Sequence, residues 1–175
     1  MGGIFALKVC VYAICKNESQ FVDRFMDSMS EADYVCVLDT GSSDDTVKKL
    51  RARGAIVGET VVSPWRFDTA RNESLGLIPA DADICCAIDL DEQFHPGWRA
   101  ALERAWQPDT TRARYRYTWS FRPDGSEGMV FWADKIHKNG CYRWASPVHE
   151  TLAYTGEGAE RFVDAAGVQL DHHPD

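Results

Sequence analysis

The chain has 175 residues, of which 45% are hydrophobic, and its 19 basic and 27 acidic side chains leave a net charge of −8. This length and apolar content suit one domain with its own core and are too small for two. The acidity, without any run of basic residues, argues against binding of nucleic acid through the whole surface. A local basic pocket for a small phosphorylated molecule stays open.

The first half of the chain alternates β-rich runs with helical patterns. We expect strands at 7–15, 34–38, 84–88 and, more weakly, 55–62. Helices are expected at 20–29, from Ser43 or Asp44 to about Gly54, and after 64–67 as far as residue 77. This alternation predicts a parallel sheet with crossover helices, whose strands end together at one edge.

The second half follows another pattern. A short helix is expected at 96–106, and aromatic residues then alternate with Arg, Thr and Ser at 114–121, which is typical of a half-exposed strand. Further strands are expected at 129–137 and 148–152, so we predict an antiparallel extension of the sheet. The chain stops at 171–175 without a predicted final helix, which suggests that this half is truncated.

The cysteines form no metal-binding pattern. They lie mostly inside apolar runs, without a Cys-x-x-Cys pair, at Cys10, Cys15, Cys36, Cys85, Cys86 and Cys141. We expect reduced, buried, small side chains. No secretory leader pattern and no long uncharged apolar window occurs, so we expect a cytoplasmic protein without a transmembrane segment.

The most informative feature is the run Asp89-Leu90-Asp91-Glu92 at the end of the fourth predicted strand. Asp89 and Asp91 are separated by one residue, so in an extended segment they point the same way and can share one hard cation with phosphate oxygens. The alternative is a solvated turn with acidic residues that have no common role.

Five short segments extend this feature along the chain. In order they are residues 14–18 (Ile-Cys-Lys-Asn-Glu), 39–46 (Asp-Thr-Gly-Ser-Ser-Asp-Asp-Thr), 67–72 (Phe-Asp-Thr-Ala-Arg-Asn), 89–92 and 148–150 (Val-His-Glu). Together they resemble the family 2 glycosyltransferases with the GT-A fold, particularly a bacterial branch whose catalytic domain often precedes helical repeats.

The resemblance covers most of the chain and implies a single GT-A domain over 1–175. This is an α/β, Rossmann-like fold whose mixed central sheet has a parallel N-terminal half flanked by helices. Residues 1–106 would bind a nucleoside-diphosphate sugar, with UDP favoured, and 107–175 would form the acceptor side. The implied activity is an inverting, metal-dependent transfer of a hexosyl or N-acetylhexosaminyl group. The acceptor would be a saccharide, a lipid-linked glycan or a protein.

Several residues can contact the nucleotide. Asp39 can accept from the imide nitrogen of uracil and Gly41 allows close approach of the backbone, although the same turn suits a helix cap. Arg71 can reach the base or the diphosphate with paired donors, unless it is an ordinary solvated helix charge. A base-facing loop is expected at Ile14, Lys16, Asn17 and Glu18. Glu18 could equally cap the next helix.

By the resemblance, Asp89, with Leu90 beside it, faces the ribose and Asp91 binds Mn²⁺ or Mg²⁺. Some GT-A enzymes add a late histidine as a metal ligand, which here would be His172, unless the tail is disordered. Glu92 is expected to orient the loop.

An inverting transfer needs a carboxylate base opposite the leaving group. Glu150 is the preferred candidate and Asp134 the other. The chain lacks the Glu-Asp pair that serves as the base motif in many relatives, so the choice stays open.

Two other functions remain open from the sequence. One is a catalytically silent nucleotide-sugar-binding or scaffolding module. The other is a nucleotidyltransferase, which would normally carry a glycine-rich basic loop after the first strand, where this chain has Lys16-Asn17-Glu18.

Overall fold

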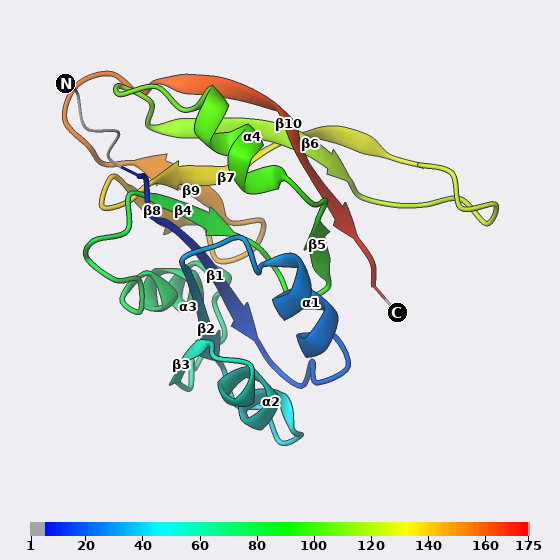
Figure 1. The fold of residues 1–175 in the computed structure, drawn as a ribbon. Coiled ribbons are helices and arrows are strands. Elements are labelled where there is room, and N and C mark those ends of the chain that lie inside the picture. Colours follow the sequence, from blue (N-terminus) through cyan, green and yellow to red (C-terminus); the bar gives the residue numbers. More distant parts are fainter. Residues whose placement is uncertain (1–5, 175) are drawn as a thin grey trace.

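The computed structural model describes residues 6–174. Its helices are α1 (Val22–Ser28), α2 (Thr46–Ala52), α3 (Phe67–Leu75) and α4 (Trp98–Ala105) (Figure 1). Its strands are β1 (Val9–Cys15), β2 (Tyr34–Asp39), β3 (Ile56–Glu59), β4 (Ile84–Ala87), β5 (Glu92–Phe94), β6 (Arg112–Thr118), β7 (Val130–Lys138), β8 (Tyr142–Ala145), β9 (Thr151–Tyr154) and β10 (Phe162–His172).

Eight of these strands form one mixed sheet in the order β3-β2-β1-β4-β7-β6-β10-β5, and β8 pairs with β9 separately. The neighbours β3, β2, β1 and β4 are parallel, whereas β7 runs antiparallel to both β4 and β6. A mixed sheet with a parallel N-terminal half is therefore confirmed. The carboxyl ends of β1, β2 and β4 meet at one edge.

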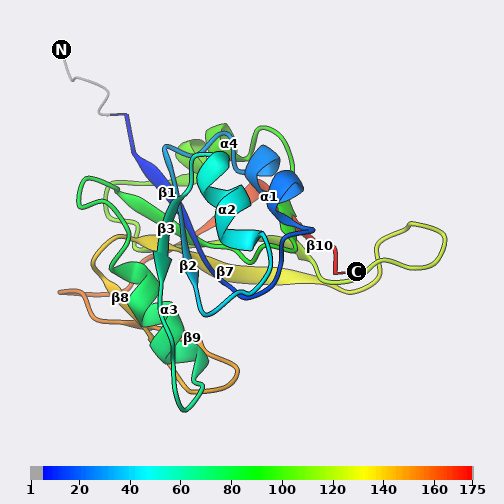
Figure 2. The same ribbon diagram turned by 90° about the horizontal axis from the view of Figure 1, so that it is seen from below.

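Both faces of β1 are covered, which explains its continuous apolar sequence. Val9, Val11 and Ala13 pack into the core that α1 and α4 share, whereas Cys10 and Tyr12 point into the core beneath β8 and β9. Figure 2 shows the resulting layers, with α1, α2 and α4 on one side of the sheet and α3 with β8 and β9 on the other.

The structure corrects the sequence-based elements mainly in the second half. The expected strand at 148–152 is largely a loop, because His149 adopts a left-handed φ of 55° and β9 begins only at Thr151. The strands β5, β8 and β10 were not predicted. In β10 the register shifts between Asp164 and Gln169, which disrupts the period of two that would have revealed the strand.

The prediction of unpaired cysteines is confirmed, since all six are free and five are buried. Within residues 6–174, no helix has the length and apolar character needed to cross a bilayer.

Candidate functional site

Two adjoining pockets lie at the carboxyl edge of the parallel strands, and Asp89 and Asp91 line both. The first, the strand-end pocket, has a volume of about 450 Å³. It is lined by Ile14, Cys15, Lys16, Glu18, Thr40, Val61, Val62, Trp65, Phe67, Arg71, Asp89 and Asp91. The second, the aromatic pocket, has a volume of about 230 Å³. It is lined by Asp89, Asp91, Glu92, Tyr115, Tyr117, Trp119, Phe131, Ala133, Lys135 and His172.

Arg71, on α3, lines the strand-end pocket and joins Asp89 to Glu150. Its side chain is 4% exposed; Nη2 donates to Asp89 Oδ1 at 2.7 Å and Nε donates to Glu150 Oε1 at 3.1 Å. The guanidinium also lies over the ring of Trp144. Its Nη1 is buried without a hydrogen-bond partner in the described chain. A buried charged donor is costly to leave unpaired, so Nη1 is suited to an acceptor from a ligand.

Asn72, the next residue, holds the sheet β8–β9 against α3. Its side-chain amide donates to the carbonyl oxygen of Trp144 at 2.8 Å and its amide oxygen accepts from the backbone N–H of Trp144 at 2.9 Å. At the start of α3, the N–H of Phe67 donates to the carbonyl of Pro147. These bonds fix the loop that presents Glu150 to Arg71.

Asp91 lies beside His172, the last residue of β10. His172 Nε2 is 3.1 Å from Asp91 Oδ2, and Nδ1 is 3.0 Å from the carbonyl oxygen of Trp119. Both ring nitrogens thus face oxygen atoms, and Nε2, beside the Asp91 carboxylate, is placed to bind a metal cation together with Asp91. A ligating histidine commonly donates its other N–H to a carbonyl, as Nδ1 does here.

A carboxylate oxygen and an imidazole nitrogen about 3 Å apart suit two neighbouring sites on an octahedral ion such as Mn²⁺ or Mg²⁺. The described residues bring no third His, Cys, Asp or Glu to the same point. The remaining ligands would be water and phosphate oxygens, which is how such ions are usually held.

Glu92 supports the loop that carries Asp89 and Asp91. It is buried, accepts from the backbone N–H of Asp89 at 2.8 Å, and accepts from the hydroxyl of Tyr117 at 2.5 Å. Burial and the nearby charge of Asp89 raise the pKa of Glu92 to about 7. This geometry agrees with a loop-orienting role.

Asp39, Gly41 and Asn17 do not line the strand-end pocket. Asp39 accepts from the backbone N–H groups of Gly41 and Ser42 at 3.0 and 2.8 Å. Burial opposes ionisation of Asp39, but the hydrogen bonds from Ser42 and Gly41 prevail and hold its pKa below the ordinary value. Gly41 has a φ of +110°, a conformation that favours glycine. The Asn17 side chain accepts from the N–H of Ser43 at 2.7 Å.

The other predicted nucleotide contacts divide into two groups. Ile14, Lys16 and Glu18 line the strand-end pocket, whereas the Leu90 side chain is buried in the core and cannot face a ligand. Burial, and then the charges of Asp89 and Asp91, raise the pKa of Glu18 to about 7.

The apolar wall of the strand-end pocket was missed as a unit. It consists of Val61, Trp65 and Phe67, which are all exposed, and the rings of Trp65 and Phe67 meet edge to face with centroids 5.2 Å apart. The sequence did carry one sign of this wall, since Trp65 and Phe67 are two aromatic residues in a segment that has neither the helical nor the strand period.

The two candidate bases differ in position. The Glu150 side chain is 13% exposed and touches Arg71, beside the strand-end pocket. Asp134 forms an ion pair with Arg112 at 3.1 Å, and neither candidate lines the two pockets, so they differ in that Glu150 contacts the pocket residue Arg71. Only Glu150 is therefore brought together with the other site residues.

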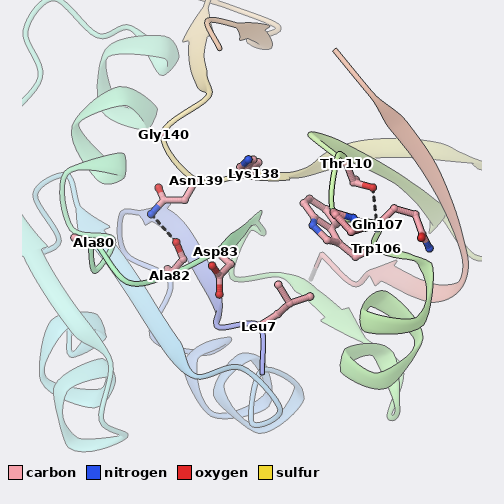
Figure 3. A pocket seen from close by; sticks show the side chains of 11 residues that line it. Leu7, Ala80, Ala82, Asp83, Trp106, Gln107, Thr110, Lys138, Asn139 and Gly140 are labelled. Atoms are coloured by element: carbon pink, nitrogen blue, oxygen red, sulfur yellow. Dashed lines mark hydrogen bonds between the residues drawn. The ribbon is translucent and has the colours of Figure 1, made fainter. Parts of the chain in front are cut away.

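A larger hollow of about 660 Å³ lies near the amino ends of β1 and β4 (Figure 3). It contains none of the predicted site residues. Asp83 there accepts from the backbone N–H of Lys8 at 2.7 Å, and Asn139 donates to the carbonyl of Ala82 at 2.9 Å. Asp83 and Asn139 are thus engaged in structural bonds, and the carboxylate pairs lie at the opposite edge of the sheet.

No family model matches this sequence. A solved structure described as a mycobacterial protein aligns over 97% of this chain and 68% of its own, with a TM-score of 0.62 and 16% identity. The fold of this chain therefore also occurs in a solved structure.

Glucosyl-3-phosphoglycerate synthase from Mycobacterium tuberculosis also aligns, over 64% of this chain, with 23% identity and a TM-score of 0.49. This chain spans 44% of the length of that protein. Crystal structures of the synthase include complexes with Mn²⁺ and UDP-glucose and with Mg²⁺ and UDP.

Proposed function

We propose that this protein is an inverting, divalent-metal-dependent glycosyltransferase of the GT-A fold that uses a nucleoside-diphosphate sugar, with UDP as the favoured nucleotide. The observation that carries the proposal is the strand-end pocket, which is lined by the Arg71–Asp89 pair and by Asp91, and Asp91 also pairs with His172 of the adjoining aromatic pocket. Its volume of about 450 Å³ falls in the range of small-molecule sites. The five segments that resemble family 2 glycosyltransferases support the same conclusion.

In this proposal the chain's own residues bind and orient the donor. Trp65 and Phe67 offer an apolar wall for the nucleotide base, and Lys16 offers a positive charge. Asp89, held by Arg71, keeps its second oxygen for the ribose. The unpaired Nη1 of Arg71 donates to a diphosphate oxygen.

Asp91 and His172 would hold Mn²⁺ or Mg²⁺, which when bound offsets the negative charge that develops on the leaving diphosphate. In the transfer, an acceptor oxygen bonds to the anomeric carbon while the bond from that carbon to the diphosphate oxygen breaks. The acceptor proton passes to a carboxylate, for which we retain Glu150, and the nucleoside diphosphate leaves. Glu150 Oε1 is engaged by Arg71, so Oε2 is the atom that would take the proton.

A titration of the protein with UDP tests the donor site. We expect UDP to raise the melting temperature when Mn²⁺ is present and Asp91→Asn to abolish that metal dependence. An unchanged metal dependence in the variant would reject Asp91 as a ligand.

Hydrolysis of UDP-sugars in the absence of acceptor then tests turnover. Glu150→Gln should lower turnover while UDP affinity is retained, and a collapse of UDP affinity would argue against its role as the base. Binding of UDP without hydrolysis of any UDP-sugar would favour the silent binding module.

A further inference from the structure

The aromatic pocket contains Asp89, Asp91 and His172 of the proposed donor site, but its remaining walls have no part in holding the donor. It shares Asp89 and Asp91 with the strand-end pocket, so a molecule bound there would face the site of metal and diphosphate from the side of β6 and β7. Its walls combine one lysine with aromatic side chains, an arrangement that suits a ligand with both an anionic group and a ring.

Lys135 is the cation in this pocket. Lys135 forms no ion pair or hydrogen bond within the described residues, and the same holds for the side chains of Lys16 and Lys138, whereas Lys8 and Lys48 pair with aspartates and Lys49 donates to a backbone carbonyl. A lysine that lines a pocket beside other polar groups and remains unpaired is available to a ligand.

The carboxylates near Lys135 already have closer partners. Asp89 is bound by Arg71 at 2.7 Å, Asp91 by His172 at 3.1 Å, and Glu92 by the hydroxyl of Tyr117 at 2.5 Å. Lys135 acts on Asp89 and Glu92 through its charge, without a hydrogen bond. Its three N–H donors are thus not needed to hold these residues in place.

The aromatic walls carry the second half of the inference. Trp119 is 46% exposed and Phe131 is 43% exposed, and both line the pocket. The Trp119 ring is held by stacking on His172, with centroids 4.4 Å apart. Large aromatic faces that stay exposed beside a pocket are typical of surfaces that bind rings.

We propose that the aromatic pocket is the acceptor subsite and that the acceptor carries a carboxylate or phosphate group bound by Lys135. The assignment of the bound molecule as acceptor rests on the proposed function. The anion site itself rests on Lys135 and the pocket walls. Lys135 is then a specificity-determining residue, since a neutral acceptor would leave its charge unpaired beside the substrate.

Calorimetric titration of the full chain tests this inference with three hexoses that differ in charge. Glucose 6-phosphate presents a phosphate, glucuronate a carboxylate, and glucose is the neutral reference. Each is titrated with UDP and Mn²⁺ present and again with both absent. The variants are Lys135→Met, Lys135→Arg and, as a matched control, Lys138→Met, because Lys138 lies on the same strand but lines the distant hollow near the amino ends of β1 and β4.

We expect at least one anionic hexose to bind about tenfold or more tightly than glucose, which corresponds to about 1.4 kcal/mol. Lys135→Met should remove this preference, and Lys135→Arg and Lys138→Met should retain it. Whichever of the two anions shows the preference identifies the acceptor group as phosphate or carboxylate.

Equal affinities for the three hexoses, or a preference that survives in Lys135→Met, would overturn the inference. UDP binding by the wild-type protein separates the inference from the proposed function, because it is measured without a hexose. If the wild-type protein failed to bind UDP with Mn²⁺, the proposed function would be rejected, while the titrations without UDP would still decide on the anion site.

Discussion

Replacing Arg71 by Met removes a buried positive charge that two carboxylates share. The Arg71 side chain is 4% exposed and bonds to Asp89 and Glu150 at 2.7 and 3.1 Å. Breaking a buried ion pair by removing one partner costs about 3–5 kcal/mol. Asp89 keeps 34% of its side-chain surface exposed, so water can partly replace the guanidinium. We therefore expect a loss near the lower end, about 3 kcal/mol.

For a chain of this size, such a loss lowers the melting temperature by roughly 6–12 °C. The assay is thermal unfolding followed by circular dichroism at pH 7. Arg114→Met is the matched control, because Arg114 pairs with Asp164 on the exposed surface and should cost no more than about 0.5 kcal/mol. The triple variant Arg71→Met, Asp89→Asn, Glu150→Gln should recover part of the loss, since it leaves no buried charge without a partner.

The pH dependence gives a second reading of the same contact. Burial works against ionisation of Asp89, but the charge of Arg71 outweighs it and holds the pKa of Asp89 below its ordinary value of 3.8. A carboxyl with a lowered pKa stabilises the fold above the unfolded value, and this contribution disappears as the pH falls through the folded one. The difference between wild type and Arg71→Met should thus be complete at pH 7 and shrink below about pH 4. A difference under 2 °C at pH 7, or one that does not change with pH, would refute the reasoning.

Three further predictions follow from the pocket geometry. His172→Ala should weaken Mn²⁺-dependent UDP binding by about tenfold, measured by calorimetry, with UDP binding in the absence of metal unchanged. Glu18→Gln should stabilise the protein by about 1 kcal/mol above pH 7, because the pKa of Glu18 is raised to about 7 and its protonated form favours the fold; the gain should vanish below pH 4.5 in thermal unfolding at several pH values. Trp65→Ala should weaken UDP binding by about tenfold or more, whereas Trp132→Ala, an exposed tryptophan that lines neither pocket, should not change it.

The candidate site was only partly predictable from local patterns. Asp89 and Asp91 follow an apolar strand and Arg71 lies on the helix that precedes it, so the sequence alternation predicts their elements. Asp39 met the same criterion, yet the structure turns its carboxylate onto the backbone of Gly41 and Ser42. Position along a strand indicates the edge at which a residue lies, but not whether its own loop will take up its hydrogen bonds.

By itself the sequence determined the parallel half of the sheet, its carboxyl edge and the acidic run at that edge. These features depend on hydrophobic period and on turn residues, which act over a few neighbouring positions. Only the tertiary structure decided that His172 lies beside Asp91, 81 residues earlier, and that Glu150 meets Arg71, 79 residues earlier. It also placed Lys135 and Trp119 around one pocket. These long-range contacts depend on the order of the strands in the sheet and on the pairing of β10 with β6. The local sequence period carries no information about either.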